Sequence, residues 1–320
     1  MTYLVTGGTG LIGTHVTQLL AQDGARVVIY DINPVRNRII DSLLGKQGGS
    51  NIEIIRGDIL DLAHLIRTVQ EYKVNRIVHM AALLTGAYVS NPLAILQVNC
   101  LGTINILETA RILGVEKVVW ESTQGVFGPP EKYGKKSVAD DALHGPKSVY
   151  AASTSFNEQV AKHYFSEYGV DSIGLRPGLV YGAEISANTR TGSWSITKEL
   201  MVNPALGKPG EITRGRSVDW MYVEDAARAI VMASKTKTTK SRVFNVTGDF
   251  RTIDEAVNHV KKLIPDAKLT VIPGPNIPSV KRDSTGAKKE IGYDSQWTME
   301  QGIEKTIREV RDGIVKPTAV

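Results

Sequence analysis

The chain has 320 residues, with 38 Lys and Arg against 33 Asp and Glu, and a formal net charge of +5. Its single cysteine, Cys100, excludes an internal disulfide and a cysteine-based zinc cage. No apolar run approaches the ~18 residues of a membrane helix. The lysine clusters lie in expected loops and helix ends without interleaved aromatic side chains. We therefore expect a cytoplasmic globular protein with no metal site and no membrane or nucleic-acid partner.

The first elements in the chain predict a dinucleotide site. An expected strand at residues 2–6 leads directly into the glycine-rich turn 7–13, GGTGLIG, and a helix follows over 11–22. Glycines at this spacing let a pyrophosphate touch backbone N–H groups at the start of a helix, where a Cβ would hold it off. The glycines of this fingerprint are Gly7, Gly10 and Gly13.

The second expected strand, residues 26–31, ends in Asp31, which lies 18 residues beyond Gly13. This is close to the spacing of about 20 residues for a carboxylate that binds the adenosine ribose. Asp31 would accept hydrogen bonds from a ribose 2′-hydroxyl and would repel a 2′-phosphate. The sequence therefore predicts NAD, rather than NADP, as the cofactor.

Strands and helices alternate through the first half of the chain. Further strands are expected at 52–55, 76–80, 117–121 and 172–176, and helices near 35–44, 61–71, 93–113 and 149–168. This alternation is typical of a parallel sheet with helices on both faces. We therefore predict an α/β fold, a Rossmann-type doubly wound parallel sheet, with residues 1–176 as its NAD-binding domain.

The pattern changes after residue 176. Irregular stretches with Gly and Pro, at 182–195, 203–218 and 273–280, separate single elements. We expect helices near 196–202, 222–234, 252–263 and 298–311, and strands at 242–247 and 269–272. Residues 177–320 are assigned to a smaller C-terminal substrate-binding lobe that is interleaved with the end of the sheet.

Three stretches carry side chains suited to chemistry at the carboxyl ends of the strands. The stretch 121–128, ESTQGVFG, places the hydroxyls of Ser122 and Thr123 directly after an expected strand. A doubly wound sheet binds its ligand at that edge. Tyr150 begins the helix near 149–168, and Asn99 lies in the helix near 93–113.

In this order, the motifs make the chain resemble the extended short-chain dehydrogenase/reductase family, in particular its NAD-dependent epimerases and dehydratases. The resemblance covers nearly the whole chain. It runs through TGGTGLIG at 6–13, GDI at 57–59, HMAA at 79–82, STQGVFG at 122–128, LRP at 175–177 and DWMYVED at 219–225.

The resemblance implies roles for particular residues. Tyr150 would be the acid/base, Thr123 would hold the reacting oxygen beside Ser122, and Asn99 would support the helix near the site. It also implies a homodimer formed through the helices near 93–113 and 149–168. The cofactor contacts that it implies are Gly7, Gly10, Leu11, Ile12, Gly13, Asp31, Asp58, Ile59, Ala81, Ala82 and Pro177.

One catalytic position departs from the family. The family signature is Tyr-x-x-x-Lys, and Thr154 stands four residues after Tyr150, where the lysine belongs. The lysine lowers the tyrosine pKa from about 10 toward neutrality and grips the nicotinamide ribose. Three explanations stay open: an engineered, inactivating substitution, a natural enzyme with a weaker base, or chemistry that does not need Tyr150 as a strong base.

A second departure bears on the substrate. Sugar-nucleotide members carry an arginine just before the Asp-Tyr-Ile-like run, and Val218 takes that place here, with Arg216 as a nearby cation. The stretch 191–195 resembles the substrate loop of threonine-dehydrogenase-type members, which act on small hydroxy acids, and contains Gly192, Ser193 and Trp194.

We therefore expect hydride transfer between NAD and a small hydroxy or keto substrate, for which an anionic carboxylate is one option. Tyr150 would move the proton and Thr123 would hold the oxygen. Two alternatives remain open. In one, a nucleotide sugar is epimerised or dehydrated with retained NAD. In the other, the loss of the lysine has left a catalytically weak NAD-binding protein.

Overall fold

The structure is a computed structural model, and it describes residues 1–45, 51–84, 91–134, 137–183, 192–213, 217–237, 242–274 and 280–313, with only the backbone over 192–194. Seven parallel strands form the central sheet, in the order β10-β6-β5-β4-β1-β2-β3. Their bounds are β1 (Thr2–Thr6), β2 (Arg26–Asp31), β3 (Ile52–Arg56), β4 (Arg76–His79), β5 (Lys117–Glu121), β6 (Ser172–Arg176) and β10 (Val243–Asn245). The strand order reverses between β1 and β4, which confirms the predicted doubly wound sheet.

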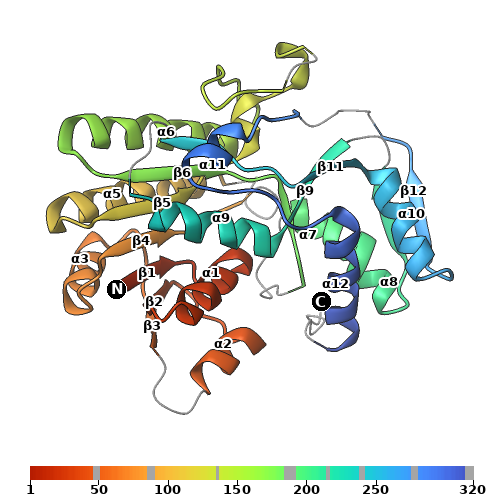
Figure 1. The fold of residues 1–320 in the computed structure, drawn as a ribbon, viewed down its shortest axis with the longest axis horizontal. Helices are drawn as coiled ribbons and strands as arrows, with labels where there is room; N and C mark the ends of the chain where they lie inside the picture. Colours follow the sequence, from red (N-terminus) through yellow and green to blue (C-terminus); the bar gives the residue numbers. More distant parts are fainter. Residues whose placement is uncertain are drawn as a thin grey trace.

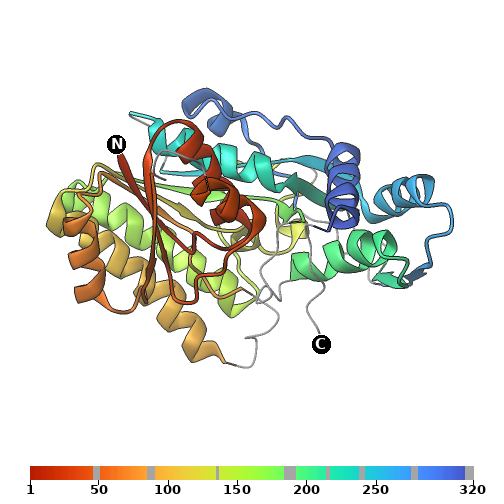
Figure 2. The ribbon, with the colours of Figure 1, turned by 90° about the horizontal axis from the view of Figure 1, so that it is seen from below.

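Helices cover both faces of this sheet (Figures 1 and 2). One face carries α1 (Leu11–Gln22) and α9 (Val223–Lys235), with α2 (Arg38–Leu44) beside α1. The other carries α3 (Leu62–Glu71), α5 (Gly102–Leu113) and α6 (Val149–Tyr168). Because strand side chains alternate, Val119 of β5 joins the core on the α1 and α9 side, whereas Val118 and Trp120 join the core beneath α5 and α6.

The helix predicted near 93–113 consists of three consecutive parts. They are α4 (Pro92–Ile95), a π-helical segment η1 (Leu96–Leu101) and α5. By length and composition, the stretch Pro92–Leu113 could cross a membrane, with a mean hydropathy of 1.3, but half of it is buried inside the fold. A core helix satisfies the same criteria, and this one packs against α3 and α6.

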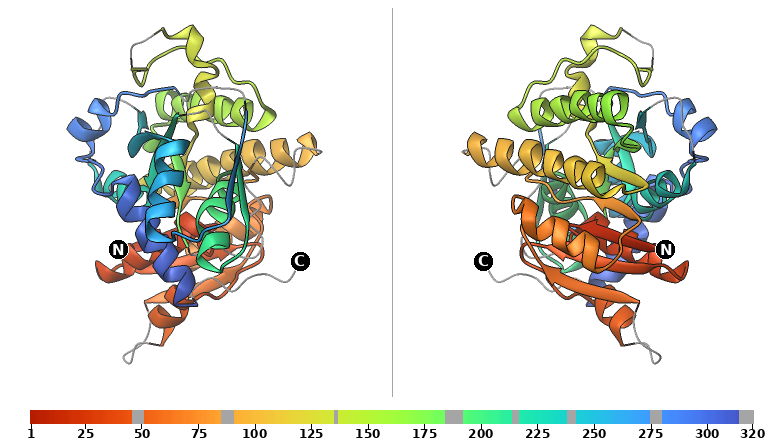
Figure 3. Two further views of the ribbon diagram at one scale, coloured as in Figure 1. Left: turned by 90° about the vertical axis from the view of Figure 1, so that its right-hand side faces the viewer. Right: turned by 90° about the vertical axis from the view of Figure 1, so that its left-hand side faces the viewer.

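The outer surfaces of the two long helices carry exposed apolar side chains. α5 and α6 lie side by side (Figure 3). Four of these side chains are at least two-fifths exposed: Leu101 of η1, Ile112 of α5, and Phe156 and Phe165 of α6. The sequence places the expected homodimer interface on these helices, and the homodimer stays a prediction.

The smaller lobe lies at one end of the sheet (Figure 1). It contains a three-stranded sheet β11-β9-β7 and a two-stranded sheet β12-β8. Its strands are β7 (Leu179–Tyr181), β8 (Gly210–Thr213), β9 (Ser217–Tyr222), β11 (Asp249–Thr252) and β12 (Leu269–Ile272). Its helical elements are α7 (Gly192–Thr197), η4 (Lys198–Val202), α8 (Asn203–Ala205), α10 (Ile253–Leu263) and α12 (Met299–Arg311). The short helix α11 (Thr285–Glu290) packs against β10 of the central sheet instead.

One feature of this half of the chain differs from the sequence prediction. The stretch 203–218 was expected to be irregular, and it contains α8, β8 and the start of β9. Beyond residue 176, β10 pairs with β6 and α9 packs against α1, so both elements complete the cofactor-binding layer. The two lobes are therefore interleaved along the chain.

Candidate active site

The glycine-rich turn has the shape of a pyrophosphate cradle. Gly7 has a φ of +63°, and a Cβ there would lie 2.8 Å from the backbone nitrogen of Ala81. A Cβ on Gly13 would collide with the carbonyl oxygen of Gly7. Gly10 is the N-cap of α1 and supplies no side-chain hydrogen bond to it, so the helix N-terminus is open to an anion. These residues fit a dinucleotide.

Asp31 is held beside this turn at the end of β2. Its Oδ2 accepts hydrogen bonds from the Thr9 hydroxyl at 2.7 Å and from the Thr9 backbone nitrogen at 3.3 Å, and its Oδ1 accepts one from Asn33 N at 3.1 Å. The carboxylate is thereby fixed at the end of the strand next to the cradle. A group in this position suits the adenosine ribose.

The other predicted cofactor residues follow the carboxyl edge of the sheet. Asp58 comes just after β3 and accepts a hydrogen bond from Leu60 N at 2.9 Å. Ile59 is almost completely buried, and a Cβ on Gly102 of α5 would collide with it. Ala81 is partly buried and Ala82 is exposed, just beyond β4. Ile59 therefore fixes α5 against this edge.

Asn99 lies in η1 and acts on the backbone that follows β4. Its Oδ1 accepts a hydrogen bond from Leu83 N at 2.8 Å, and its Nδ2 donates one to Leu83 O at 2.9 Å. Asn99 is buried. The structure therefore gives it a positioning role for the chain around Ala81 and Ala82. A π-helical segment often marks a functional region of a helix, and this one carries Asn99.

Thr123 and Tyr150 lie on neighbouring segments, the turn after β5 and the start of α6, beside the carboxyl edge of the sheet where a doubly wound fold has its ligand crevice. Thr123 follows β5 and caps the short helix η2 (Gln124–Phe127), since its hydroxyl oxygen accepts a hydrogen bond from Gly125 N at 3.2 Å. Tyr150 lies in the first turn of α6, whose N-cap Ser148 accepts a hydrogen bond from Ala151 N at 3.1 Å. The Thr123 hydroxyl lies near the Tyr150 phenol, close enough to lower the pKa of that phenol.

Ser122 and Thr154, by contrast, form their side-chain hydrogen bonds with groups other than Tyr150. The Ser122 hydroxyl donates a hydrogen bond to Glu158 Oε1 at 2.7 Å. The Thr154 hydroxyl donates one to Ala151 O at 3.0 Å within α6. Both residues are buried. Of the two hydroxyls predicted to face the crevice after β5, only that of Thr123 reaches Tyr150.

The electrostatic surroundings keep Tyr150 protonated. Burial raises the pKa of Tyr150 far above its usual range, the negative charge of Glu121 raises it further, and the nearby Thr123 hydroxyl lowers it only in part. Among the described residues, no cation contributes to lowering this pKa. Tyr150 is therefore a neutral phenol at neutral pH, able to donate a proton.

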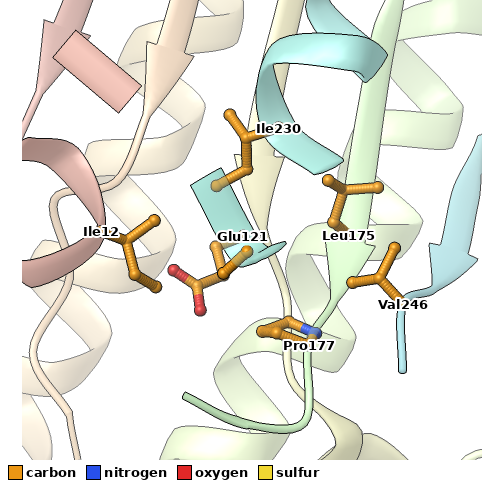
Figure 4. A pocket seen from close by; sticks show the side chains of 7 residues that line it. Ile12, Glu121, Leu175, Pro177, Ile230 and Val246 are labelled. Atoms are coloured by element: carbon orange, nitrogen blue, oxygen red, sulfur yellow. The ribbon is translucent and has the colours of Figure 1, made fainter. Parts of the chain in front are cut away.

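Glu121 is a site residue that the sequence reasoning missed. It is the last residue of β5 and lines a pocket together with Ile12 of the glycine-rich turn and Pro177 after β6 (Figure 4). Burial raises the pKa of Glu121 to about 7. Strand alternation could have found it, because Glu121 lies two residues after Val119 and on the same side of β5.

The positions that the sequence links to the substrate lie in β9, on α7 and outside the described residues. Val218 is buried in β9 as part of the apolar core. The next residue, Asp219, pairs with the buried Arg282. Arg216 lies outside the described residues. Gly192, Ser193 and Trp194 belong to α7, and only their backbone is described.

The sequence profile of the NAD dependent epimerase/dehydratase family matches residues 3–247. The chain belongs to this family. A UDP-glucose 4-epimerase of Mycolicibacterium smegmatis is 29% identical to it over 98% of this chain and 99% of the relative. UDP-glucuronate 4-epimerase 1 of Arabidopsis thaliana is 28% identical over 95% of this chain and 75% of the relative.

Solved structures agree with this assignment. The complex of Thermus thermophilus UDP-glucose 4-epimerase with NAD superposes with a TM-score of 0.83 at 26% identity, covering 97% of this chain and 99% of the other. A dTDP-glucose 4,6-dehydratase of Bacillus anthracis in complex with NAD, at 23% identity and a TM-score of 0.83, shares the fold. This epimerase/dehydratase family member is thus an NAD-dependent enzyme, as the glycine-rich turn and Asp31 predict.

Proposed function

We propose that this enzyme acts on a nucleotide sugar, oxidising a ring carbinol to a ketone and reducing it again, so that NAD is not consumed. The observation that carries this proposal is the similarity to the mycobacterial UDP-glucose 4-epimerase, which spans nearly the full length of both chains. This similarity favours the alternative of a retained cofactor over our first expectation, a small hydroxy or keto substrate.

The residues of the crevice support such a cycle. Bound NAD would supply the hydride acceptor and donor, with the glycine-rich turn and Asp31 holding its adenosine half. Thr123 would hold the reacting oxygen by hydrogen bonding. When the carbinol is oxidised, its C–H hydride would pass to the bound cofactor and its O–H proton would pass to Tyr150 in its phenolate form. When the ketone is reduced, Tyr150 returns a proton to the oxygen.

The protonation state of Tyr150 makes the two half-reactions unequal. A neutral phenol is ready to protonate the ketone oxygen, whereas oxidation of the carbinol requires a base. In this chain burial and Glu121 both oppose formation of the phenolate. We therefore expect the oxidation half-reaction to limit turnover at neutral pH and to accelerate as the pH rises.

A small hydroxy or keto substrate is the second candidate, and Val218 favours it. The position before Asp219 is an apolar core residue. The nearby buried cation Arg282 is occupied by Asp219 and by the carbonyl oxygen of Arg176. The described residues at this place therefore offer no free cation for a diphosphate, whereas an uncharged small substrate needs none.

Cofactor retention and substrate conversion distinguish the two candidates. We expect the purified protein to keep near-stoichiometric NAD through long dialysis, measured after denaturation, and to interconvert UDP-glucose and UDP-galactose without added cofactor. Loss of NAD on dialysis, with NADH formed from a small hydroxy acid and added NAD, would instead establish the second candidate. Rebinding of NAD but not NADP checks the role of Asp31 in either case.

Restoring the missing lysine tests whether Tyr150 acts as the base. Positions 150 and 154 lie on one face of α6, and an opposite charge within about 4–6 Å lowers a pKa by about one to three units. We expect Thr154→Lys to raise the rate of substrate oxidation at neutral pH at least about tenfold, measured by single-turnover reduction of bound NAD. Thr154→Met, of similar length but without charge, is the control. An equal or lower rate in Thr154→Lys would mean that the site uses different chemistry.

A further inference from the structure

Glu121 is a titratable side chain that neither gives nor takes a proton in the proposed reaction. Its carboxylate points into the pocket between Ile12 and Pro177 (Figure 4). The rest of the pocket wall is apolar and comes from the glycine-rich turn, β6, α9 and the segment after β10. The other lining residues are Leu175, Ala226, Ile230 and Val246.

Within the described residues, Glu121 has no hydrogen-bond or ion-pair partner. Glu158 shows the contrast, because it is completely buried, whereas Glu121 is partly buried, and yet it receives hydrogen bonds and charge from Arg176, so that its pKa falls to about 2. Burial without such a partner raises the pKa of Glu121 to about 7. A carboxylate in an apolar wall is costly unless a cation or a donor meets it, so a ligand in the pocket is the expected partner.

The order of the strands indicates which part of NAD would lie at this pocket. The pyrophosphate would cross the reversal point between β1 and β4 at the N-terminus of α1. Asp31 on β2 marks the adenosine side of that point. The nicotinamide half would therefore extend the other way, over the carboxyl ends of β4, β5 and β6, where Glu121 and Pro177 lie.

We propose that Glu121 selects the oxidation state of the cofactor: its carboxylate stabilises the positively charged, oxidised nicotinamide and offers nothing comparable to the neutral, reduced ring. The charges around Glu121 are consistent with this role, because no cation of the described site competes with the nicotinamide. Tyr150 is neutral, position 154 carries no lysine, and the described pocket wall contains no cation. The inference rests on the NAD site alone and holds for either candidate substrate.

The affinities of the two cofactor forms test it. An opposite charge shifts a carboxylate pKa by about one to three units, and by linkage the same factor appears in the affinity of the cation. We expect Glu121→Gln to weaken binding of oxidised NAD about tenfold or more and to change the NADH affinity by less than about threefold. Calorimetry or fluorescence titration of cofactor-stripped protein measures both constants.

Glu116→Gln is the matched control. It makes the same change on an exposed carboxylate at the opposite end of β5, and it should leave both affinities unchanged. Equal losses for NAD and NADH in Glu121→Gln would overturn the proposal, since charge could not be the cause. No change for either form would overturn it as well. Failure of the unaltered protein to bind any dinucleotide would contradict the cofactor assignment itself.

A second measurement needs no variant. Oxidised NAD should favour the ionised carboxylate, so its affinity should rise severalfold as the pH increases through about 7, while the NADH affinity stays flat. Of the groups that face Glu121, those from α1, β6 and α9 in the pocket wall are apolar. The titratable neighbour on α6 is Tyr150, which stays neutral over this range. Parallel pH profiles for the two forms would contradict the proposal.

Discussion

Replacing Tyr150 with phenylalanine is expected to lower kcat for the proposed epimerisation by about 10²- to 10⁴-fold, the usual contribution of a positioned acid/base. The variant removes the phenol that lies near Thr123 and would leave the reacting oxygen without its proton donor. Binding of NAD should be unaffected, because the cradle and Asp31 lie on other elements. The measurement is the steady-state rate of UDP-glucose and UDP-galactose interconversion, with the cofactor content determined in parallel.

Tyr168→Phe is the control for this prediction. It makes the same change at the other end of α6, where the tyrosine is more than half exposed. We expect its rate to match that of the unaltered protein. If Tyr150→Phe kept more than about a third of the original kcat, the proton would have to move by another route, and the role assigned to Tyr150 would be wrong.

The cofactor half of the fold was predictable because its signals are local. The glycine-rich turn requires positive φ at Gly7 and close packing at Gly13, and only glycine meets both conditions. Strand alternation and the helical stretches between strands then define the doubly wound sheet. The C-terminal lobe was less predictable. Its strands β7, β8 and β11 have only three or four residues, too short for a clear period.

The orientation of the side chains around Tyr150 could be predicted only in part from the sequence. Position in the sequence predicts that Ser122 and Thr123 both lie near the crevice, and the resemblance adds Tyr150. It does not predict that Ser122 turns inward to Glu158, because that depends on α6, which lies more than 25 residues further along the chain. Glu121 escaped notice for a related reason. The wall that isolates its carboxylate comes from elements spread between Ile12 and Val246.

The buried pair of Glu158 and Arg176 should carry the largest effect on stability. Arg176 Nε donates to Glu158 Oε1 at 2.8 Å and Nη2 donates to Oε2 at 2.6 Å. Both side chains are almost completely inaccessible to solvent. Removing one partner leaves an uncompensated charge in the interior, which costs about 3–5 kcal/mol. We therefore expect Glu158→Ala to lower the free energy of unfolding by about this amount, measured by urea denaturation.

Glu167→Ala, on an exposed position of the same helix, is the control and should change the free energy of unfolding by less than about 0.5 kcal/mol. The pH dependence gives an independent check. Burial alone would raise the pKa of Glu158, but the hydrogen bonds and charge from Arg176, with further bonds from His144 and Ser122, hold it at about 2. The stabilisation is therefore present above the unfolded value of about 4.3 and is lost as the pH falls toward 2.

The same pair also positions the catalytic crevice. Glu158 on α6 binds both Arg176 at the end of β6 and Ser122 just after β5, so it joins the helix that carries Tyr150 to the strand that leads into Thr123. Under conditions where Glu158→Ala remains folded, we expect a reduced kcat without loss of NAD affinity, because the displacement falls on the Thr123 and Tyr150 pair. A variant as stable and as active as the original protein would show that neither the fold nor the crevice depends on this network.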